Sequence, residues 1–210
     1  MEVITRKDWH GVFQEISKLM ISNKDLLSEI DARFGDGDHG ITIEKIAHLM
    51  EKVSNDWINS DADLKTLFSE IGTGVTNISG GSAGPLYGTY FGGLGEELQD
   101  ETEADAALLK IILKSGLTEL QYLSNAKVGD KTMMDTLIPA TEAALSAPDD
   151  IVQIVTAAKE AALKGAKDSE NYISKFGRAR SYKEKTIGTP DAGAQSCTYI
   201  FTGLYNVLSK

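Results

Sequence analysis

The 210-residue chain contains a single cysteine and no long apolar run. Cys197 has no second cysteine to pair with, so an internal disulfide is impossible and a reducing, cytoplasmic setting suits the sequence. Cys197 stands in an apolar stretch, which favours a buried structural thiol over a nucleophile. No stretch of about 18 apolar residues occurs, so no membrane span is expected. The N-terminus leads into a polar amphipathic segment and not into the apolar core of a signal peptide.

Positive charge is also scarce, since 21 Lys and Arg stand against 31 Asp and Glu, for a net charge of −10. A nucleic-acid-binding surface needs clustered Lys and Arg, so neither DNA nor RNA is expected as a partner. Nucleotide binding stays possible, because a metal ion can supply the missing positive charge. The chain shows no linker, internal repeat or low-complexity tract, and we expect residues 1–210 to form one domain.

Strand signals are weak, because no convincing run alternates apolar and polar residues and no Asn-Gly hairpin turn occurs. Apolar residues recur instead at spacings of three and four, which is the period of an amphipathic helix. We therefore predict an all-α fold of about eight or nine antiparallel helices joined by short connections. Apolar stripes run through 9–19, 43–53 and 64–78, and long helices are expected at 104–123 and 149–170.

The glycines gather in four places, namely 35–40, 72–93, 129 and 177–193. Glycine is costly inside a helix. We therefore expect these clusters to mark helix ends. Loops at one end of a helical scaffold are a place where a ligand site can be built.

The first chemical motif holds three carboxylates within eight residues, Asp31, Asp36 and Asp38. Magnesium prefers oxygen ligands and often takes a few carboxylates together with substrate phosphates. An EF-hand is excluded, since Ala47 stands where that motif needs a bidentate Glu. The competing interpretation is a solvated acidic turn in which Asp38 caps the following helix. This motif alone does not decide between the two.

The helix after this turn begins with His39, Gly40, Ile41 and Thr42. Free backbone N–H groups at a helix N-terminus attract anions, and Thr42 could add a hydroxyl. Aspartates at the same place would repel a phosphate unless a metal lay between them. A metal with a phosphate would resolve this conflict.

The second motif is the small-residue segment Ser79-Gly-Gly-Ser-Ala-Gly-Pro-Leu-Tyr-Gly-Thr89. Small residues let the backbone approach a ligand closely, and Pro85 suits the first turn of a helix. It is not a Walker A loop, because the chain has no Gly-Lys-Ser/Thr. It is not a dinucleotide fingerprint either, because no strand precedes it. An anion-binding loop and a tight helix–helix turn both remain open.

The third motif, residues 129–135, reads as a helix start capped by Asp130 or Thr132. Met133 could face an adenine ring, because Met adapts to flat apolar surfaces, or it could fill the core. Pro139 predicts a kink in the helix that follows.

The fourth motif is a basic patch followed by a helix start. Arg178 could contact phosphate or stack on a base, whereas solvated loop charges would explain Lys183 and Lys185 equally well. Residues 191–196 read as the capped start of the last helix.

Together, G-D-x-D-H-G, G-G-x-x-G-P-L-x-G, G-D-K-T-M and G-R-A…I-G…D-x-G-A resemble the nucleotide (ADP)-binding, DhaL-type subunit or domain of dihydroxyacetone kinases. Their order and spacing match over nearly the whole chain. The resemblance implies a barrel of about eight antiparallel helices, with the nucleotide at one end bound through two Mg²⁺ ions.

The resemblance also implies site residues. The metal ligands would be Asp31, Asp36 and Asp38. The ADP or ATP contacts would be His39, Gly40, Ile41, Thr42, Ser82, Ala83, Ser124, Met133, Arg178, Asp191, Ala192 and Gly193. No covalent catalytic residue is expected.

The activity that the resemblance implies is phosphoryl transfer to a ketose held on a separate kinase subunit. The stand-alone length favours the branch linked to the phosphoenolpyruvate phosphotransferase system, in which bound ADP is recharged by a phosphohistidine-carrying subunit. A transcription regulator is a further possible partner. Relatives acting on dihydroxyacetone often read G-R-A-S-Y, whereas Arg180 interrupts that string here. An ATP-dependent kinase subunit for another ketose such as erythrulose, and a non-catalytic interaction module, therefore remain alternatives.

Overall fold

The computed structural model describes residues 1–79 and 81–210. In this part of the chain there are nine α-helices and two 3₁₀ helices, and the only β pairing is an isolated bridge between Ile4 and Ala104. The all-α prediction is therefore confirmed. In chain order the elements are α1 (Arg6–Ser22), α2 (Lys24–Ala32), α3 (His39–Ile58), α4 (Leu64–Thr76), α5 (Ala83–Gly93), α6 (Ala106–Leu123), α7 (Met134–Ser146), α8 (Ile151–Asp168), η1 (Ser169–Asn171), η2 (Arg178–Thr186) and α9 (Ala192–Leu208).

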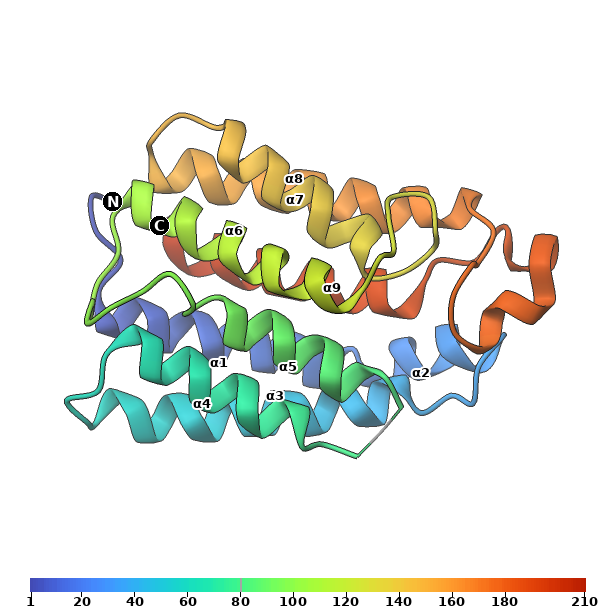
Figure 1. The fold of residues 1–210 in the computed structure, drawn as a ribbon, viewed down its shortest axis with the longest axis horizontal. Coiled ribbons are helices and arrows are strands. Elements are labelled where there is room, and N and C mark those ends of the chain that lie inside the picture. The colour runs from blue at the N-terminus through green and yellow to red at the C-terminus, as the bar shows by residue number, and fades with distance from the viewer. Residues whose placement is uncertain (80) are drawn as a thin grey trace.

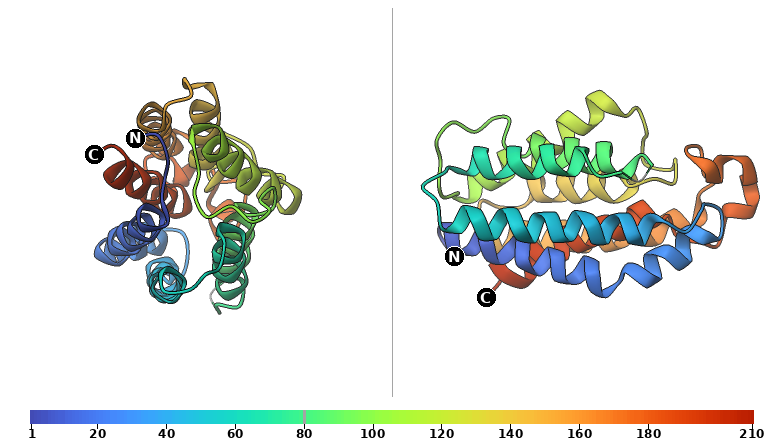
Figure 2. Two further views of the ribbon diagram at one scale, coloured as in Figure 1. Left: turned by 90° about the vertical axis from the view of Figure 1, so that its left-hand side faces the viewer. Right: turned by 90° about the horizontal axis from the view of Figure 1, so that it is seen from below.

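Eight of these helices form a closed ring, which is seen end-on in the left panel of Figure 2. Going round the ring, α1 packs on α3, then follow α4, α5, α6, α7, α8 and α9, and α9 packs back on α1. The short helix α2 lies outside this order and packs mainly on α3. The predicted barrel of about eight helices is thus the architecture of the chain, with α2 as an addition.

Successive helices of the ring run in opposite directions (Figure 1), so alternate connections meet at the same end. The connections at 33–38, 124–133 and 169–191, and the described residues 77–79 and 81–82, therefore lie at one end of the barrel. Four helices begin there, α3, α5, α7 and α9. Their N-termini bring free backbone N–H groups and the positive ends of four helix dipoles to this end.

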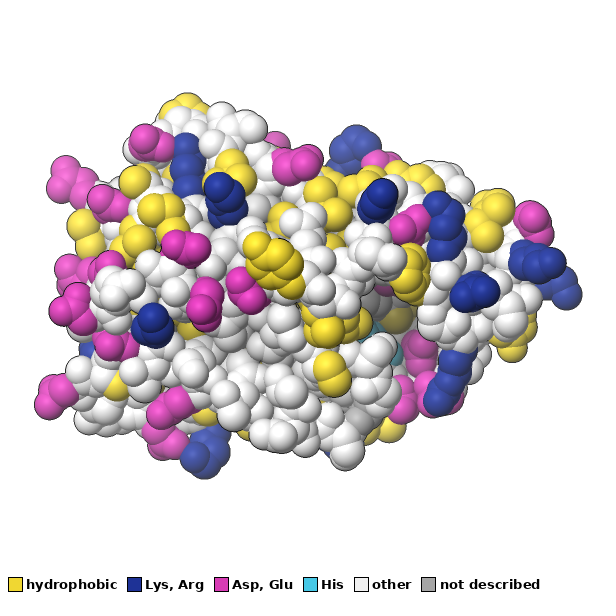
Figure 3. Space-filling view, in the orientation of Figure 1, with side chains coloured by type: hydrophobic (Ala, Val, Ile, Leu, Met, Phe, Trp, Pro, Cys, Tyr) yellow, Lys and Arg dark blue, Asp and Glu magenta, His cyan; other side chains and the backbone are white. Residues whose placement is uncertain are grey.

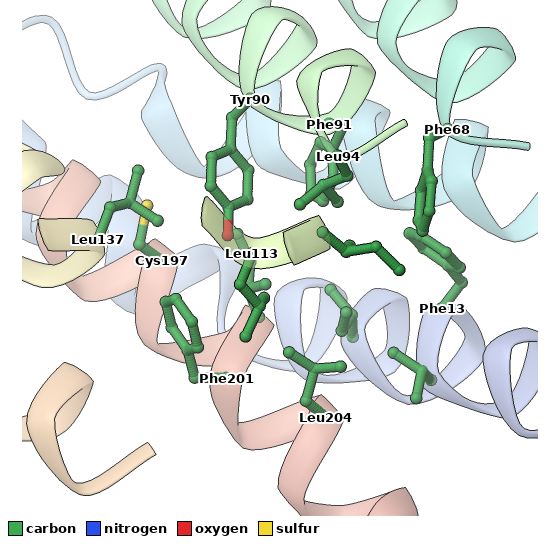
Figure 4. Packing of buried hydrophobic residues seen from close by; sticks show 14 of the residues in the cluster. Phe13, Phe68, Tyr90, Phe91, Leu94, Leu113, Leu137, Cys197, Phe201 and Leu204 are labelled. Carbon is green, nitrogen blue, oxygen red and sulfur yellow. The ribbon is translucent and has the colours of Figure 1, made fainter. Parts of the chain in front are cut away.

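The core is built from the apolar stripes that the sequence predicted. Trp9 and Phe13 on α1 reach across to Phe68 on α4, and the rings of Trp9 and Phe68 meet edge to face with centroids 5.4 Å apart. Phe91 on α5 joins them from the neighbouring helix (Figure 4). Burial of such side chains stabilises a fold by roughly 1.5–3 kcal/mol each.

Cys197 lies in this core and is fully buried. Burial raises the pKa of its thiol to about 12, so it stays protonated. The structure confirms a structural cysteine. None of the helices in the described residues has both the length and the apolar character needed to cross a membrane.

Short polar side chains start several helices, as the sequence indicated. Thr5 and Asp8 form a reciprocal capping box at α1. Asp150 accepts a hydrogen bond from the Gln153 N–H and opens α8, which confirms the helix predicted at 149–170 with slightly shorter bounds. The helix predicted at 104–123 is α6, and Pro139 lies inside α7.

The expectation that the glycine clusters mark helix ends holds for part of the cluster at 72–93, since Gly84 and Gly93 lie at the two ends of α5, and is wrong for the rest. Gly72 lies inside α4, and Gly88 and Gly92 lie inside α5. A Cβ on Gly72 would stand 2.5 Å from the Gly92 Cα and 2.8 Å from the Gly88 carbonyl oxygen. These glycines therefore serve close helix–helix packing.

The predicted cap of α7 is confirmed in part. The helix begins at Met134 and Met133 is its N-cap residue, but the Thr132 hydroxyl accepts a hydrogen bond from the Met134 N–H at 3.2 Å. Asp135, from within the first turn, accepts hydrogen bonds from the N–H groups of Gly129 and Thr132, both 2.6 Å long. Its carboxylate is fully buried, so it holds the preceding loop from inside the protein.

Candidate functional site

A cavity of about 330 Å³ opens at the end of the barrel where four helices begin. Figure 3 shows the surface hollowed there, beside a right-hand lobe on which Lys and Arg side chains gather. Segments far apart in the sequence line it. The lining residues are Ile30, Asp31, Phe34, Gly35, Asp36, Asp38, His39, Thr42, Gly81, Ser82, Ala83, Leu86, Tyr87, Lys131, Thr132, Met133, Ser174, Phe176, Gly177, Arg178, Ala179 and Pro190–Gly193.

A larger, open groove of about 680 Å³ runs along the outside of α4 and α5. Glycines and hydroxyl side chains line it, with Glu70, Glu96 and Glu119. This groove lies where α4 and α5 approach closely, because the glycines there have no side chains to fill it. The acidic cluster lies in the smaller cavity, so we take that cavity as the candidate site.

Three carboxylates converge on one wall of the cavity. Asp31, Asp36 and Asp38 each offer an oxygen, and these oxygens all lie within 4.8 Å of one another. The turn after α2 creates this arrangement, because the Gly37 N–H donates to Asp31 Oδ2 at 2.8 Å and Gly37 has φ of +75°. That left-handed backbone favours glycine.

The donor set fits a hard divalent cation. Oxygen ligands from a few carboxylates are what Mg²⁺ takes alongside substrate phosphates. Asp38 occupies the N-cap position of α3, but its side chain makes no capping hydrogen bond. The competing interpretation, in which Asp38 serves as a helix cap, therefore loses its main support. Asp36 is ion-paired with Arg178.

Two helix N-termini face the same cavity. His39 and Thr42 come from the first turn of α3, and Thr42 is buried. Ser82 is the N-cap residue of α5, and its hydroxyl makes no capping hydrogen bond. Pro85 lies in the first turn of α5, as predicted. Unsatisfied backbone N–H groups at such helix starts bind anions.

His39 is held by a chain of buried hydroxyl groups. Its Nε2 lies 2.8 Å from Ser196 Oγ, and the Tyr87 hydroxyl lies 2.6 Å from the same oxygen. Ser196 Oγ also donates to the Ala192 carbonyl at 2.9 Å. Burial lowers the pKa of His39, while Asp31 and the Ala192 carbonyl oppose that shift. The ring orientation is thus set from within the barrel.

The opposite wall is apolar and carries a half-buried acid, Asp191. Met133 is 6% exposed, and a Cβ on Gly193 would stand 3.4 Å from its side chain. Asp191 opens α9 by accepting a hydrogen bond from the Ala194 N–H at 2.7 Å, which confirms the predicted helix start. Burial raises the pKa of Asp191 to about 7, although this backbone donor opposes the rise.

Lys131 also lines the cavity, beside this wall. Its ammonium group donates to the carbonyls of Ser169 and Thr189, and the residue is 4% exposed. Burial lowers the pKa of Lys131, while Asp191 and Asp135 oppose that shift.

Most residues expected from the sequence meet in the cavity. Twelve of them line it: Asp31, Asp36, Asp38, His39, Thr42, Ser82, Ala83, Met133, Arg178, Asp191, Ala192 and Gly193. Three do not. Gly40 packs against α2, Ile41 is 53% exposed on α3, and Ser124 follows the last residue of α6.

Sequence reasoning missed the supporting residues. Lys131 and Tyr87 stood in the quoted motifs, but their partners lie 38 to 110 residues away in the chain. Ser196 ended the fourth motif with no role assigned to it. No local pattern predicts contacts at such separations, so only the assembled barrel reveals them.

The geometry defines a class of molecule: a closed antiparallel helical barrel with an acidic cavity at the end where four of its helices begin. The family follows from the sequence comparison. The profile of the DAK2 domain matches residues 33–206, and the chain belongs to this family. The family resemblance predicted from the motifs is thereby confirmed.

Curated relatives fall into two kinds. The chain is 30% identical over 201 residues to the ADP-binding subunit DhaL of PEP-dependent dihydroxyacetone kinase 2 from Listeria innocua serovar 6a, covering 95% of this chain and 93% of that protein. It is 31% identical over 199 residues to the L-erythrulose kinase of Pectobacterium atrosepticum, covering 91% of this chain but 33% of that protein.

A solved structure supports the fold. The dihydroxyacetone kinase from C. freundii, in complex with AMP-PNP and Mg²⁺, matches with a TM-score of 0.69 and 27% identity, covering 94% of this chain and 33% of that one. The chain thus corresponds to about a third of the two longer enzymes and to nearly all of the Listeria subunit.

Proposed function

We propose that this chain is the phosphoryl-transferring, ADP- and magnesium-binding subunit of a phosphoenolpyruvate-dependent dihydroxyacetone kinase. The observation that carries the proposal is the meeting of Asp31, Asp36 and Asp38 with the start of α3 in one cavity. Carboxylates attract a metal ion, and free N–H groups at a helix start attract an anion. The two together therefore suit a metal–phosphate ligand better than a metal ion or a phosphate alone. The near full-length match to an ADP-binding DhaL subunit supports this function.

In the proposed mechanism, Asp31, Asp36 and Asp38 would hold two Mg²⁺ ions, which would supply positive charge against the negative oxygens of the nucleotide's phosphates. The N–H groups at the starts of α3 and α5 orient the phosphates, with the hydroxyls of Thr42 and Ser82. Phosphoryl transfer depends on such positioning and electrostatic stabilisation, so no covalent residue of this chain is required.

The rest of the cavity serves the nucleoside in this proposal. Met133 offers an apolar surface to a base, and Asp191, Ala192 and Gly193 form the adjoining wall. Arg178 lies across the acidic side and can pair with phosphate in place of Asp36.

The match to an ADP-binding subunit supports the proposed partners. A ketose-binding kinase subunit would present the ketose, whose hydroxyl accepts the phosphoryl group. A phosphohistidine-carrying phosphotransferase subunit would recharge bound ADP. A transcription regulator and a cytoplasmic location also belong to the proposal.

A second candidate is an ATP-dependent subunit for another ketose, such as erythrulose. The similarity to an L-erythrulose kinase supports it, because that relative is 31% identical to this chain. Arg180 supports it as well, since this exposed cation lies in η2, two residues from Arg178 of the cavity lining.

Removing one proposed metal ligand tests the site. We expect Asp36→Ala to weaken magnesium-dependent ADP binding by about 100-fold or more, because a carboxylate ligand is lost. Isothermal titration calorimetry with and without Mg²⁺ measures this. The control is Asp61→Ala, which removes an exposed carboxylate between α3 and α4, at the other end of the barrel. The proposal fails if the wild-type protein binds no ADP in either condition, or if Asp36→Ala binds it unchanged.

A further inference from the structure

Lys131 is a buried cation to which the proposed function assigns no role. Its ammonium group donates to the Ser169 carbonyl at 2.6 Å and to the Thr189 carbonyl. Asp135 and Asp191 both act on its charge. The ammonium donates to carbonyls of buried residues, and nearby Asp135 and Asp191 balance its charge, so its role lies within the wall and not on a phosphate.

The backbone at Lys131 adds a second observation. Its φ is +60°, in the left-handed region that residues other than glycine rarely adopt. The loop is held in this conformation on both sides, since Asp135 accepts the N–H groups of Gly129 and Thr132. Glycine would fit this backbone with less strain, so the side chain is the reason for a lysine here.

Lys131 joins three segments that are distant in sequence. They are the loop 129–133, the short helix η1, and the segment 189–193 that leads into α9. Ser169 reinforces the junction, because its hydroxyl accepts a hydrogen bond from the Asp191 N–H at 3.0 Å. The first and the last of these segments supply the apolar wall of the cavity, with Met133 on one side and Gly193 on the other.

We infer that Lys131 is a positioning residue that fixes the nucleoside-binding wall of the cavity. This inference rests on the proposed function. It separates two halves of the site: the acidic cluster and helix starts recognise phosphate without Lys131, whereas the Met133–Gly193 wall depends on it. Loss of the ammonium frees the Thr189 carbonyl and lets the segment 189–193 move away from the loop 129–133.

Two ligands distinguish the two halves. In the presence of Mg²⁺, Lys131→Met should bind ADP on the order of tenfold more weakly, the effect of losing about one buried polar contact. Its affinity for inorganic pyrophosphate should stay that of the wild-type protein, since pyrophosphate has no nucleoside. Lys131→Gly, which removes the ammonium and relaxes the backbone strain, should show the same selective loss. Lys175→Met is the matched control, because Lys175 pairs with Asp130 from the surface.

A second measurement needs no ligand. Hydrogen exchange of the unliganded Lys131→Met protein should be faster at residues 189–193 and unchanged at residues 36–42. Unchanged exchange at 189–193 overturns the inference, as does an equal loss of ADP and pyrophosphate binding. Unfolding of both Lys131 variants would also overturn it, since the role would then be general stability. A wild-type protein that binds neither ligand would instead refute the proposed function.

Discussion

At the scale of single residues, burial decides what a carboxylate does here. Asp63 and Asp191 both cap a helix by accepting a backbone N–H, from Thr66 and Ala194. The bond to Thr66 lowers the pKa of Asp63. Burial outweighs the same kind of bond at Asp191 and raises its pKa to about 7. The cavity therefore carries an acid that is costly to ionise, as functional cavities often do.

Asp191 should make the unliganded protein less stable as the pH rises from about 4 to 7. Its folded-state pKa of about 7 exceeds its ordinary value of 3.8, so the folded state keeps a proton that the unfolded state releases. Asp191→Asn removes this dependence and can still cap α9. Across that pH range the free energy of unfolding of the variant should rise relative to that of the wild type, by about 1.4 kcal/mol for each unit by which the two pKa values of Asp191 differ. Urea unfolding at several pH values measures it.

Asp63→Asn is the control with the opposite sign. The pKa of Asp63 is lowered, so its stabilisation is present above pH 3.8 and is lost as the pH falls below that value. This variant should lose a constant amount of stability above pH 4, with the deficit shrinking in acid. If the free energy of unfolding of Asp191→Asn and that of the wild type changed with pH in parallel, burial would not have the role that we give it at Asp191.

At the scale of elements, α4 and α5 pack through glycines along much of their length. The Cα atom of Gly92 is so near Gly72 that a methyl group on Gly72 would collide with backbone, which cannot yield as a flexible side chain can. Gly92 itself has room, because a Cβ there would meet only the Gly72 Cα at 3.6 Å. The helix interface thus requires glycine at position 72 but has room for a methyl group at position 92.

Gly72→Ala should lower the free energy of unfolding by about 1–3 kcal/mol, the usual cost of overpacking, although alanine is the better helix former. Gly92→Ala is the matched variant and should be neutral or stabilising by up to about 1 kcal/mol. Urea denaturation measures both. Equal effects of the two substitutions would refute close packing as the reason for Gly72.

At the scale of the whole molecule, the alternating direction of the ring helices places the site. Every second connection returns to the same end, so four helix starts and the acidic turn meet there (Figure 1). The Lys and Arg side chains gather at that end of an otherwise acidic molecule (Figure 3). The proposed partner subunits would approach this end, because the cavity opens there.

The choice of phosphoryl donor can be tested only with the proposed partner subunits present. With its ketose-binding partner and a phosphoenolpyruvate-driven phosphohistidine chain, we expect the protein to phosphorylate dihydroxyacetone with ADP at catalytic amounts. If ADP stays bound as a coenzyme, ATP added without that chain should support at most about one turnover per site, because the ADP left behind blocks further ATP. Coupled product assays compare the two donors. Sustained turnover with ATP alone would favour the erythrulose-kinase type of subunit instead.

Local sequence determined the helices and the reactive groups of this protein. Apolar spacing predicted the stripes that form the core, and Asp150 and Asp191 predicted helix starts, because both depend on contacts within a turn or two of chain. The acidic turn was readable for the same reason, since Asp31, Asp36 and Asp38 are neighbours in sequence.

Tertiary structure alone decided how these parts support one another. The glycines of α4 and α5 looked like helix ends, because a sequence does not say which backbones will touch. Asp135 holds the loop before α7 from inside the protein, a contact that the predicted cap did not include. Lys131 and Tyr87 gained their partners only when the ring closed, since contacts across 38 to 110 residues follow from packing and not from local preference.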